Sequence, residues 1–126
     1  MEQKRKSVLI VDDDNRNVFA LSLVLRSKGY EVQTAGDAQS GINLMLERNN
    51  NTGILLLDMM MPDMDGYQAL QQIRATAELK HMPVIAVTAQ AMPGDQEKCL
   101  QAGADGYISK PIDLDILTGI LTQYLS

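Results

Sequence analysis

ILLLDMMMPDMDG (residues 54–66) ends a run of four aliphatic residues with Asp58, and this pattern indicates a buried strand that carries an acid at its carboxyl end. Three further stretches also end an apolar run with polar residues: VLIVDDD (8–14), VIAVTA (84–89) and YISKP (107–111). The carboxyl ends of parallel strands line one crevice of an open α/β sheet. We therefore expect five side chains to meet at this edge: Asp12, Asp13, Asp58, Thr88 and Lys110.

The rest of the chain favours a parallel α/β fold, because short apolar runs alternate with longer segments of helical periodicity. Asp14 and Asp113 are expected to cap helices at their start, and Gly29 and Gly103 suit left-handed caps at helix ends. The predicted strands cover residues 7–11, 31–35, 54–57, 83–88 and 106–109. The predicted helices cover about 16–28, 38–48, 66–76, 94–102 and 113–125.

Length and composition are those of one small domain, residues 1–126, with a formal net charge of −5. The 11 Lys and Arg residues are scattered, which argues against direct nucleic-acid binding. Cys99 is the single cysteine, so an internal disulfide is excluded, and we expect a cytoplasmic protein. The apolar run after the basic start, residues 8–11, is too short for a signal peptide or membrane span.

The expected acidic cluster predicts a metal site. Close carboxylates repel one another by roughly 4 kcal/mol per pair at the dielectric of a protein surface, so the cluster needs a cation. Oxygen ligands without a nearby His or Cys indicate Mg²⁺, with Asp13 and Asp58 as direct ligands and Asp12 acting through water. Lys110 and Thr88 are donors suited to phosphoryl oxygens. The site therefore favours phosphoryl transfer, with Asp58 as the nucleophile.

These motifs, together with AGADGYISKP (102–111), resemble the receiver domain of two-component response regulators over nearly the whole chain. The resemblance implies a flavodoxin-like (βα)5 fold, a three-layer sandwich around a parallel five-stranded sheet of order 2-1-3-4-5. It also implies that Asp58 accepts a phosphoryl group from a phosphohistidine. By the same resemblance Mg²⁺ is held by Asp12, Asp13, Asp58 and the backbone carbonyl of Met60.

Further roles follow from this resemblance. Lys110 contacts the phosphoryl group, Pro111 follows it in a cis peptide bond, and Thr88 and Tyr107 form a switch pair. Phosphorylation would draw Thr88 inward and let Tyr107 turn, so that the surface built by residues 94–125 changes. The implied partners are a sensor histidine kinase or histidine phosphotransfer protein and a downstream effector that binds this surface. The protein would be a signalling module that catalyses only its own phosphorylation and dephosphorylation.

Three alternative functions remain to be weighed against this prediction. A phosphatase of the aspartyl-phosphate type would need a second acid two residues after Asp58, where Met60 stands. A flavin-binding flavodoxin would need a phosphate loop after the first strand, and the acids at 12–14 would repel an anion there. A phosphate-independent interaction module would be expected to lack one of the five site residues, and all five are present.

The first predicted helix carries apolar residues on more than one side. If Ala20, Leu21, Val24 and Leu25 face the sheet, helical geometry places three others on the opposite side: Val18, Phe19 and Leu23. Exposed apolar residues are common and need no explanation, but this stripe begins beside the acidic crevice. It yields the hypothesis that the stripe docks the helices of the phosphodonor.

Other reactive side chains have ordinary structural interpretations. His81 is expected to face solvent, and Cys99 to be a small buried hydrophobe. The methionines around Asp58 are expected to pack in the core and at its rim. Gln90 is placed by analogy to orient a hydrolytic water. The sequence fits both a stand-alone regulator and a receiver excised from a hybrid histidine kinase.

Overall fold

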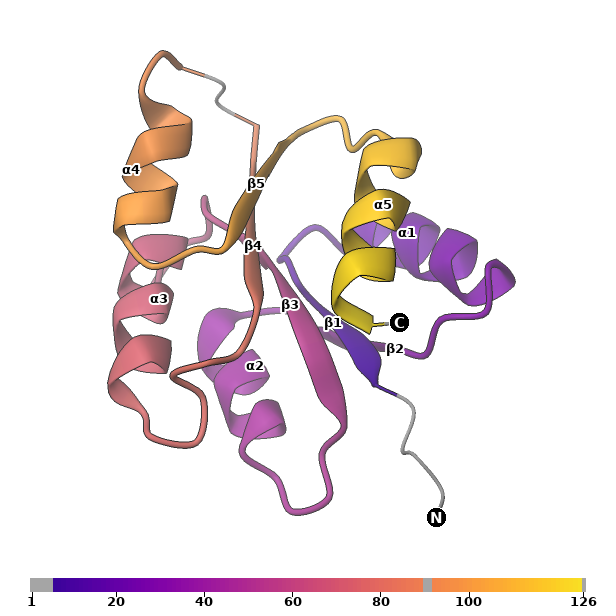
Figure 1. Cartoon of the computed structure of the whole chain (residues 1–126), viewed down its shortest axis with the longest axis horizontal. Coiled ribbons are helices and arrows are strands. Elements are labelled where there is room, and N and C mark those ends of the chain that lie inside the picture. The colour runs from indigo at the N-terminus through magenta and orange to yellow at the C-terminus, as the bar shows by residue number, and fades with distance from the viewer. Residues whose placement is uncertain (1–5, 90–91, 126) are drawn as a thin grey trace.

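The computed structural model describes residues 6–89 and 92–125, where five strands alternate with five helices (Figure 1). The strands are β1 (Ser7–Val11), β2 (Val32–Ala35), β3 (Thr52–Asp58), β4 (Val84–Thr88) and β5 (Gly106–Ser109). The helices are α1 (Asn15–Ser27), α2 (Ala38–Met45), α3 (Gly66–Ala75), α4 (Asp95–Gln101) and α5 (Leu114–Leu125). All ten predicted elements are therefore present. Within these residues no helix is long and apolar enough to cross a bilayer.

The strands form one parallel sheet in the order β2-β1-β3-β4-β5. Helices α1 and α5 cover one face of this sheet, and α2, α3 and α4 cover the other (Figure 1). The arrangement confirms the predicted flavodoxin-like three-layer fold. Because β1 and β3 are neighbours, with Val11 paired to Leu57, the residues that follow them emerge side by side at the carboxyl edge.

Two hydrophobic clusters hold the helices to the sheet. Strands β1 and β4 are buried throughout and β3 over its last five residues, because helices cover both faces. Successive strand residues point to opposite faces, so Leu9 and Leu55 join the cluster beneath α2, α3 and α4, whereas Val8 and Leu56 join the one beneath α1 and α5. The central strands are thus fixed from both sides, which gives the site at their ends a rigid base.

The helix ends follow the predicted capping residues. Asp14 accepts hydrogen bonds from two backbone amides at the start of α1, and Asp113 does the same at the start of α5. Asp65 caps α3 in a capping box. Gly29 and Gly103, with φ of 96° and 115°, adopt the left-handed conformation expected after α1 and α4.

Helix α2 ends at Met45, three residues before the predicted end. The polar run 48–51 has no apolar face to bury, and Asn49 adopts a left-handed φ of 67°, which an asparagine tolerates better than most residues. Asn50 then accepts a hydrogen bond from the backbone amide of Thr52, where β3 begins. The turn into β3 is therefore built from these asparagines.

Helix α1 faces the sheet on a slightly different side than predicted. Val18 was expected to face water, but it is half-buried and packs against the cluster beneath α1 and α5. Ala20 was expected to face the sheet, but it is exposed. Ser22 and Leu25 are the buried residues of this helix, which shifts the buried stripe to Val18, Ser22 and Leu25. Phe19 and Leu23 are exposed, as predicted, at 67% and 51%.

Candidate functional site

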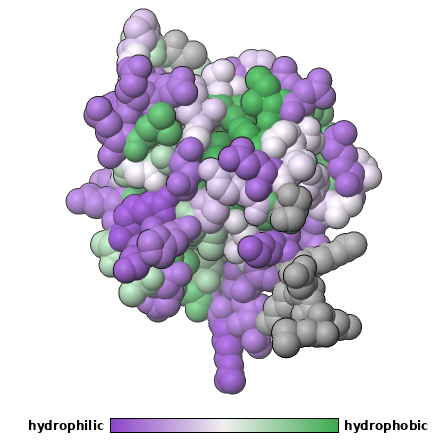
Figure 2. All heavy atoms as spheres, in the orientation of Figure 1, coloured by the Kyte–Doolittle hydropathy of each residue, from purple (hydrophilic) through white to green (hydrophobic). Residues whose placement is uncertain are grey.

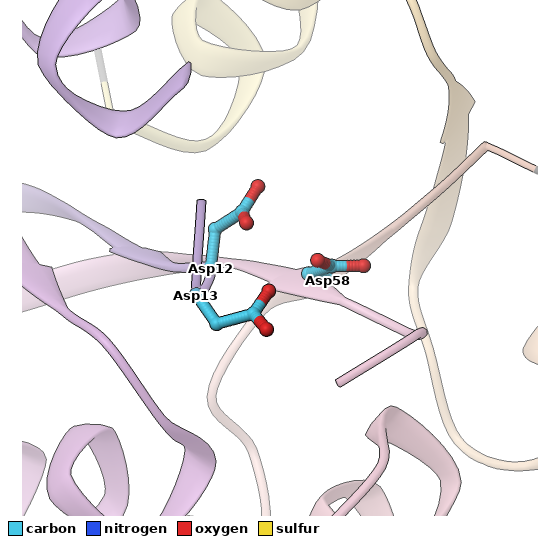
Figure 3. Close-up of side chains that lie close together, drawn as sticks. All are labelled: Asp12, Asp13 and Asp58. Carbon is cyan, nitrogen blue, oxygen red and sulfur yellow. The ribbon is translucent and has the colours of Figure 1, made fainter. Parts of the chain in front are cut away.

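Three carboxylates meet at the carboxyl edge of the sheet (Figure 3). Asp58 is the last residue of β3, and Asp12 and Asp13 directly follow the end of β1. Each of the three offers one oxygen, and these oxygens lie within 4.8 Å of one another. The predicted convergence of Asp12, Asp13 and Asp58 is therefore present in the structure.

The three acids differ in burial. Asp12 and Asp58 are buried, whereas Asp13 is exposed. Burial raises the pKa of Asp58, a hydrogen bond from the backbone amide of Met60 lowers it, and the charge of Asp12 raises it again. The charge of Lys110 also lowers it, but the net effect is a raised pKa, so the ionised form of Asp58 is less favoured than that of an ordinary carboxyl group.

Lys110 supplies a positive charge beside these acids. It lies just after β5, and its Nζ donates a hydrogen bond to Asp12 Oδ2 at 3.0 Å and lies 3.6 Å from Asp58 Oδ2. Burial disfavours the charged ammonium, but the bond to Asp12 and the charges of Asp58 and Asp12 raise the pKa of Lys110 above its usual value. Lys110 is therefore a permanent cation in this cluster, and it precedes Pro111 in the predicted cis peptide bond.

Backbone amides fix the orientation of both buried acids. The amide of Asp14 donates to Asp12 Oδ1 at 2.8 Å, and the amide of Met60 donates to Asp58 Oδ1 at 2.9 Å. Gly66 lets the loop with the Met60 amide fold closely onto the end of β3, because a Cβ on Gly66 would lie 2.7 Å from Met59 Cα. The loop between β3 and α3 therefore closes tightly against the strand end that carries Asp58.

Thr88 and Tyr107 lie on adjacent strands next to the acids. Thr88 ends β4 and is buried, and its backbone carbonyl accepts a hydrogen bond from the amide of Lys110 at 2.7 Å. Tyr107 is half-buried on β5, and its hydroxyl donates to Asp95 Oδ2 at 3.0 Å. Asp95 begins α4 and was not singled out from the sequence, because an acid in a first helical turn is ordinary.

Two hollows flank the site. A groove of about 520 Å³ lies between α1 and the start of α5, and its lining includes Asp12, Lys110, Val18 and Leu114. A second cavity of about 490 Å³ is lined by residues of the β3–α3 loop, α3, β4 and α4: Met59, Met60, Met61, Asp65, Tyr67, Thr88, Asp95 and Lys98. Figure 2 shows apolar side chains gathered over β5 and the start of α5. The acidic cluster thus lies between a mainly apolar groove and a cavity lined by both apolar and charged residues.

The structure also bears on the predictions for the methionines around Asp58, for His81 and for Cys99. Met59 and Met61 are buried, but Met60 is 51% exposed beside Asp58. His81 is exposed and Cys99 is buried, as expected. Gln90 lies outside the described residues, so the structure does not address its predicted role with water.

Comparison with known proteins gives one consistent family. Residues 8–122 match the family model of the response regulator receiver domain. The chain is 39% identical over 117 residues to the sensor histidine kinase RcsC of Escherichia coli K12, covering 93% of this chain but only 12% of RcsC. It is 36% identical over 121 residues to the polar-differentiation response regulator DivK of Brucella ovis, covering 95% of this chain and 96% of DivK.

A solved structure agrees with these relatives. The receiver domain of the sensor histidine kinase PA1611 from Pseudomonas aeruginosa PAO1 superposes with a TM-score of 0.82 and 35% identity, over 97% of this chain and 98% of that one. That crystal structure holds a magnesium ion coordinated in its active site cleft.

Proposed function

This chain belongs to the response regulator receiver family, and on that premise we propose that Asp58 accepts a phosphoryl group from a phosphohistidine of a partner protein in a two-component or phosphorelay system. The observation that carries the proposal is the meeting of Asp12, Asp13 and Asp58 beside Lys110. We take residues 1–126 as a single receiver domain that acts as a signalling module.

The acidic cluster fits Mg²⁺. Its three carboxylates are hard oxygen donors within 4.8 Å of one another, and Lys110 offsets only part of their charge. We propose that Asp12, Asp13, Asp58 and the backbone carbonyl of Met60 hold the ion, directly or through water. When bound, Mg²⁺ neutralises negative charge on the carboxylates and on the phosphoryl oxygens.

Asp58 is the nucleophile in the proposed transfer. One oxygen of its carboxylate bonds to the phosphorus of the donor phosphohistidine, and the bond between phosphorus and the imidazole nitrogen breaks. The imidazole leaves with the electron pair of that bond and binds a proton. The hydrogen bond from Met60 to Oδ1 holds the carboxylate in one orientation, which leaves the Oδ2 side toward Lys110.

Lys110 and Thr88 then respond to the new group. The ammonium of Lys110 lies 3.6 Å from Asp58 Oδ2, close enough to move onto a phosphoryl oxygen. Thr88 ends the neighbouring strand and donates its hydroxyl to another oxygen, which draws it toward Asp58. Tyr107 turns into the space beside Thr88, and the surface formed by α4, β5 and α5 changes for a downstream effector.

The proposed phosphodonor is a sensor histidine kinase or a histidine phosphotransfer protein. Phe19 and Leu23 are exposed on α1, and the groove lined by Val18 runs from this helix to Asp12 and Lys110. We propose that helices of the donor pack on this apolar area and bring the phosphohistidine to Asp58.

Mass spectrometry of the intact chain tests the proposal. With acetyl phosphate and Mg²⁺ the unaltered protein should gain one phosphoryl group, and Asp58→Asn should gain none. Asp63→Asn is the matched control, because Asp63 is an exposed acid of the same loop whose left-handed φ of 66° suits asparagine. Equal labelling of Asp58→Asn, or no labelling of the unaltered chain, would show that Asp58 is not the acceptor.

A further inference from the structure

Asp95 stands between two tyrosines that come from different elements. Tyr107 on β5 donates its hydroxyl to Asp95 Oδ2 at 3.0 Å, and Tyr67 on α3 approaches Asp95 Oδ1 at 3.5 Å. The first contact has ordinary hydrogen-bond length, whereas the second is long. Asp95 therefore ties the start of α4 to β5 firmly and to α3 more loosely.

The bond from Tyr107 to Asp95 is of the stronger, charge-assisted kind, because the acceptor is a carboxylate. Asp95 is half-buried, so water competes for it less than for a surface acid. Burial and the bond to Asp95 both raise the pKa of the Tyr107 phenol, which keeps the hydroxyl protonated as a donor. Tyr107 thus has a definite partner at the α4 side of its strand.

Open space separates that partner from the site. Asp95 and Thr88 line the same cavity of about 490 Å³. The residue that holds the Tyr107 hydroxyl and the residue toward which Tyr107 turns in the proposed switch therefore border one cavity. Tyr107 itself packs against the core cluster beneath α2, α3 and α4, so its hydrogen bond to Asp95 is the polar contact that holds the hydroxyl at the α4 side.

We propose that Asp95 is a positioning residue that holds Tyr107 in its present position beside α4, here called the outward position, and so sets how strongly the unphosphorylated state is favoured. This inference rests on the proposed function of Asp58 and deepens it. Phosphorylation must break the bond between Tyr107 and Asp95 before the surface of α4, β5 and α5 can change. The free energy of that hydrogen bond then opposes the change that phosphorylation of Asp58 produces.

Linkage between the two positions gives the expected effect. Consider a ligand that binds only the state in which Tyr107 has turned inward. When the outward state of Tyr107 is destabilised, the inward state becomes more populated, and the apparent affinity of that ligand rises by the same factor. Fluoroberyllate with Mg²⁺ imitates the phosphoryl group on Asp58. Loss of the bond to Asp95 should therefore tighten fluoroberyllate binding by about five- to tenfold, although Asp95 does not belong to the acidic cluster.

The test is a double-mutant cycle on the whole chain, with the Kd of fluoroberyllate measured by calorimetry at saturating Mg²⁺. Asp95→Ala removes the acceptor, and Tyr107→Phe removes the donor hydroxyl but keeps the ring. Each single variant should bind about five- to tenfold more tightly than the unaltered chain. The double variant should bind no more tightly than either, because each change breaks the same bond.

Two controls separate this role from a general effect of the changes. Glu97→Ala removes another acid from the first turn of α4, and Tyr30→Phe removes a phenol hydroxyl from the loop after α1. Neither should alter the Kd. Where Asp95→Ala does not fold, Asp95→Asn keeps the side-chain shape without its charge and should tighten binding by a smaller factor in the same direction.

The outcomes distinguish this inference from the function on which it rests. The positioning role is overturned if Asp95→Ala binds fluoroberyllate no more tightly than the unaltered chain. It is also overturned if Asp95→Ala tightens binding by the same factor in the Tyr107→Phe background as in the unaltered chain. In both cases the receiver function stands. Failure of the unaltered chain to bind fluoroberyllate overturns the proposed function, and the positioning role with it.

Discussion

Lys110 donates a hydrogen bond to Asp12 at 3.0 Å, although the two residues are 98 positions apart in the sequence. The contact uses the same ammonium that lies near Asp58. Lys110 therefore offsets the carboxylates before any metal arrives, and the metal and the phosphoryl group each have to change this arrangement. Its two roles, as counterion and as phosphoryl ligand, can be separated by experiment.

Replacement of Lys110 by methionine should affect metal binding and phosphorylation in opposite directions. Lys110→Met keeps most of the side-chain volume but removes the cation, so the carboxylates attract Mg²⁺ more strongly, by about tenfold or about 1.4 kcal/mol. Phosphorylation by acetyl phosphate should slow by about 100-fold, because a donor to the transferred group is lost. Calorimetry gives the first quantity and intact-mass kinetics the second.

Lys80→Met is the matched control, since Lys80 is exposed in the connection between α3 and β4 and lies outside the acidic cluster. It should leave both quantities unchanged. Weaker Mg²⁺ binding by Lys110→Met would contradict the counterion role.

Asp58→Asn should stabilise the metal-free protein near pH 7. The pKa of Asp58 is raised in the folded state, mainly by burial, so its ionised form at neutral pH lowers the free energy of unfolding. Replacement by asparagine removes that cost, so the variant should have the higher free energy of unfolding at pH 7. A raised carboxyl pKa contributes its full stabilisation at a pH below the pKa of the unfolded state. That contribution is lost as pH rises through the pKa of the folded state. The advantage of Asp58→Asn over the unaltered chain should therefore shrink toward about pH 4.

Urea denaturation with a chelator, followed by circular dichroism at both pH values, measures this difference. Asp63→Asn is the matched control and should change the free energy of unfolding by less than about 0.5 kcal/mol, because Asp63 is exposed. Saturating Mg²⁺ should reverse the order, since the unaltered chain then gains metal binding that the variant lacks. A variant less stable than the unaltered chain at pH 7 without metal would contradict the electrostatic argument.

The acidic cluster was predictable because strand ends obey a topological rule. Asp12 follows β1, and Asp58 and Thr88 are the last residues of β3 and β4; parallel strands bring such positions to one edge. Lys110 was predictable for the same reason, with the order of the strands supplied by the family resemblance. These positions depend on the backbone alone, so local sequence patterns together with the strand order were sufficient.

Contacts between side chains of different elements were not predictable in this way. In the sequence Asp95 is an ordinary acid in the first turn of a helix. Its hydrogen bond with Tyr107 becomes visible only when α4 is placed beside β5. Val18 and Ala20 exchanged their expected exposure because helical periodicity fixes relative angles on α1 but not the rotation of the helix against the sheet. That rotation depends on the packing of the whole cluster beneath α1 and α5.

Arg74 is another residue that the sequence did not single out, and its replacement should be strongly destabilising. Its guanidinium donates to the carbonyls of Gly103, Met82 and Lys80 and to Asp105, so one side chain ties the loop before β4 to the loop before β5. Arg74→Met should lower the free energy of unfolding by about 2–4 kcal/mol, because several carbonyls lose a charged donor. Urea denaturation measures the loss.

Arg26→Met is the control for Arg74→Met. Arg26 donates from an exposed position to the carbonyl of Val32, and its replacement should cost less than about 1 kcal/mol. Equal losses for the two variants would show that the contacts of Arg74 contribute no more than a surface arginine does.

Phe19→Glu should slow phosphotransfer from a protein donor without affecting a small one. Phe19 is 67% exposed on α1, and its replacement places a charge on the apolar area where we propose that the donor helices pack. Transfer from a phosphorylated histidine phosphotransfer protein, identified by a screen of purified donors, should slow at least about tenfold. Labelling by acetyl phosphate should be unchanged, because Phe19 does not belong to the acidic cluster.

Leu46→Glu provides the control for this surface. Leu46 is 41% exposed at the end of α2, which covers the opposite face of the sheet (Figure 1). The same change of an exposed apolar residue to glutamate should therefore leave both reactions unaffected. Equal transfer rates for Phe19→Glu and the unaltered chain would exclude α1 as the donor surface, and an equal decrease for Leu46→Glu would point to net charge rather than to a docking site. A decrease confined to Phe19→Glu and to the protein donor is the result that the apolar area on α1 requires.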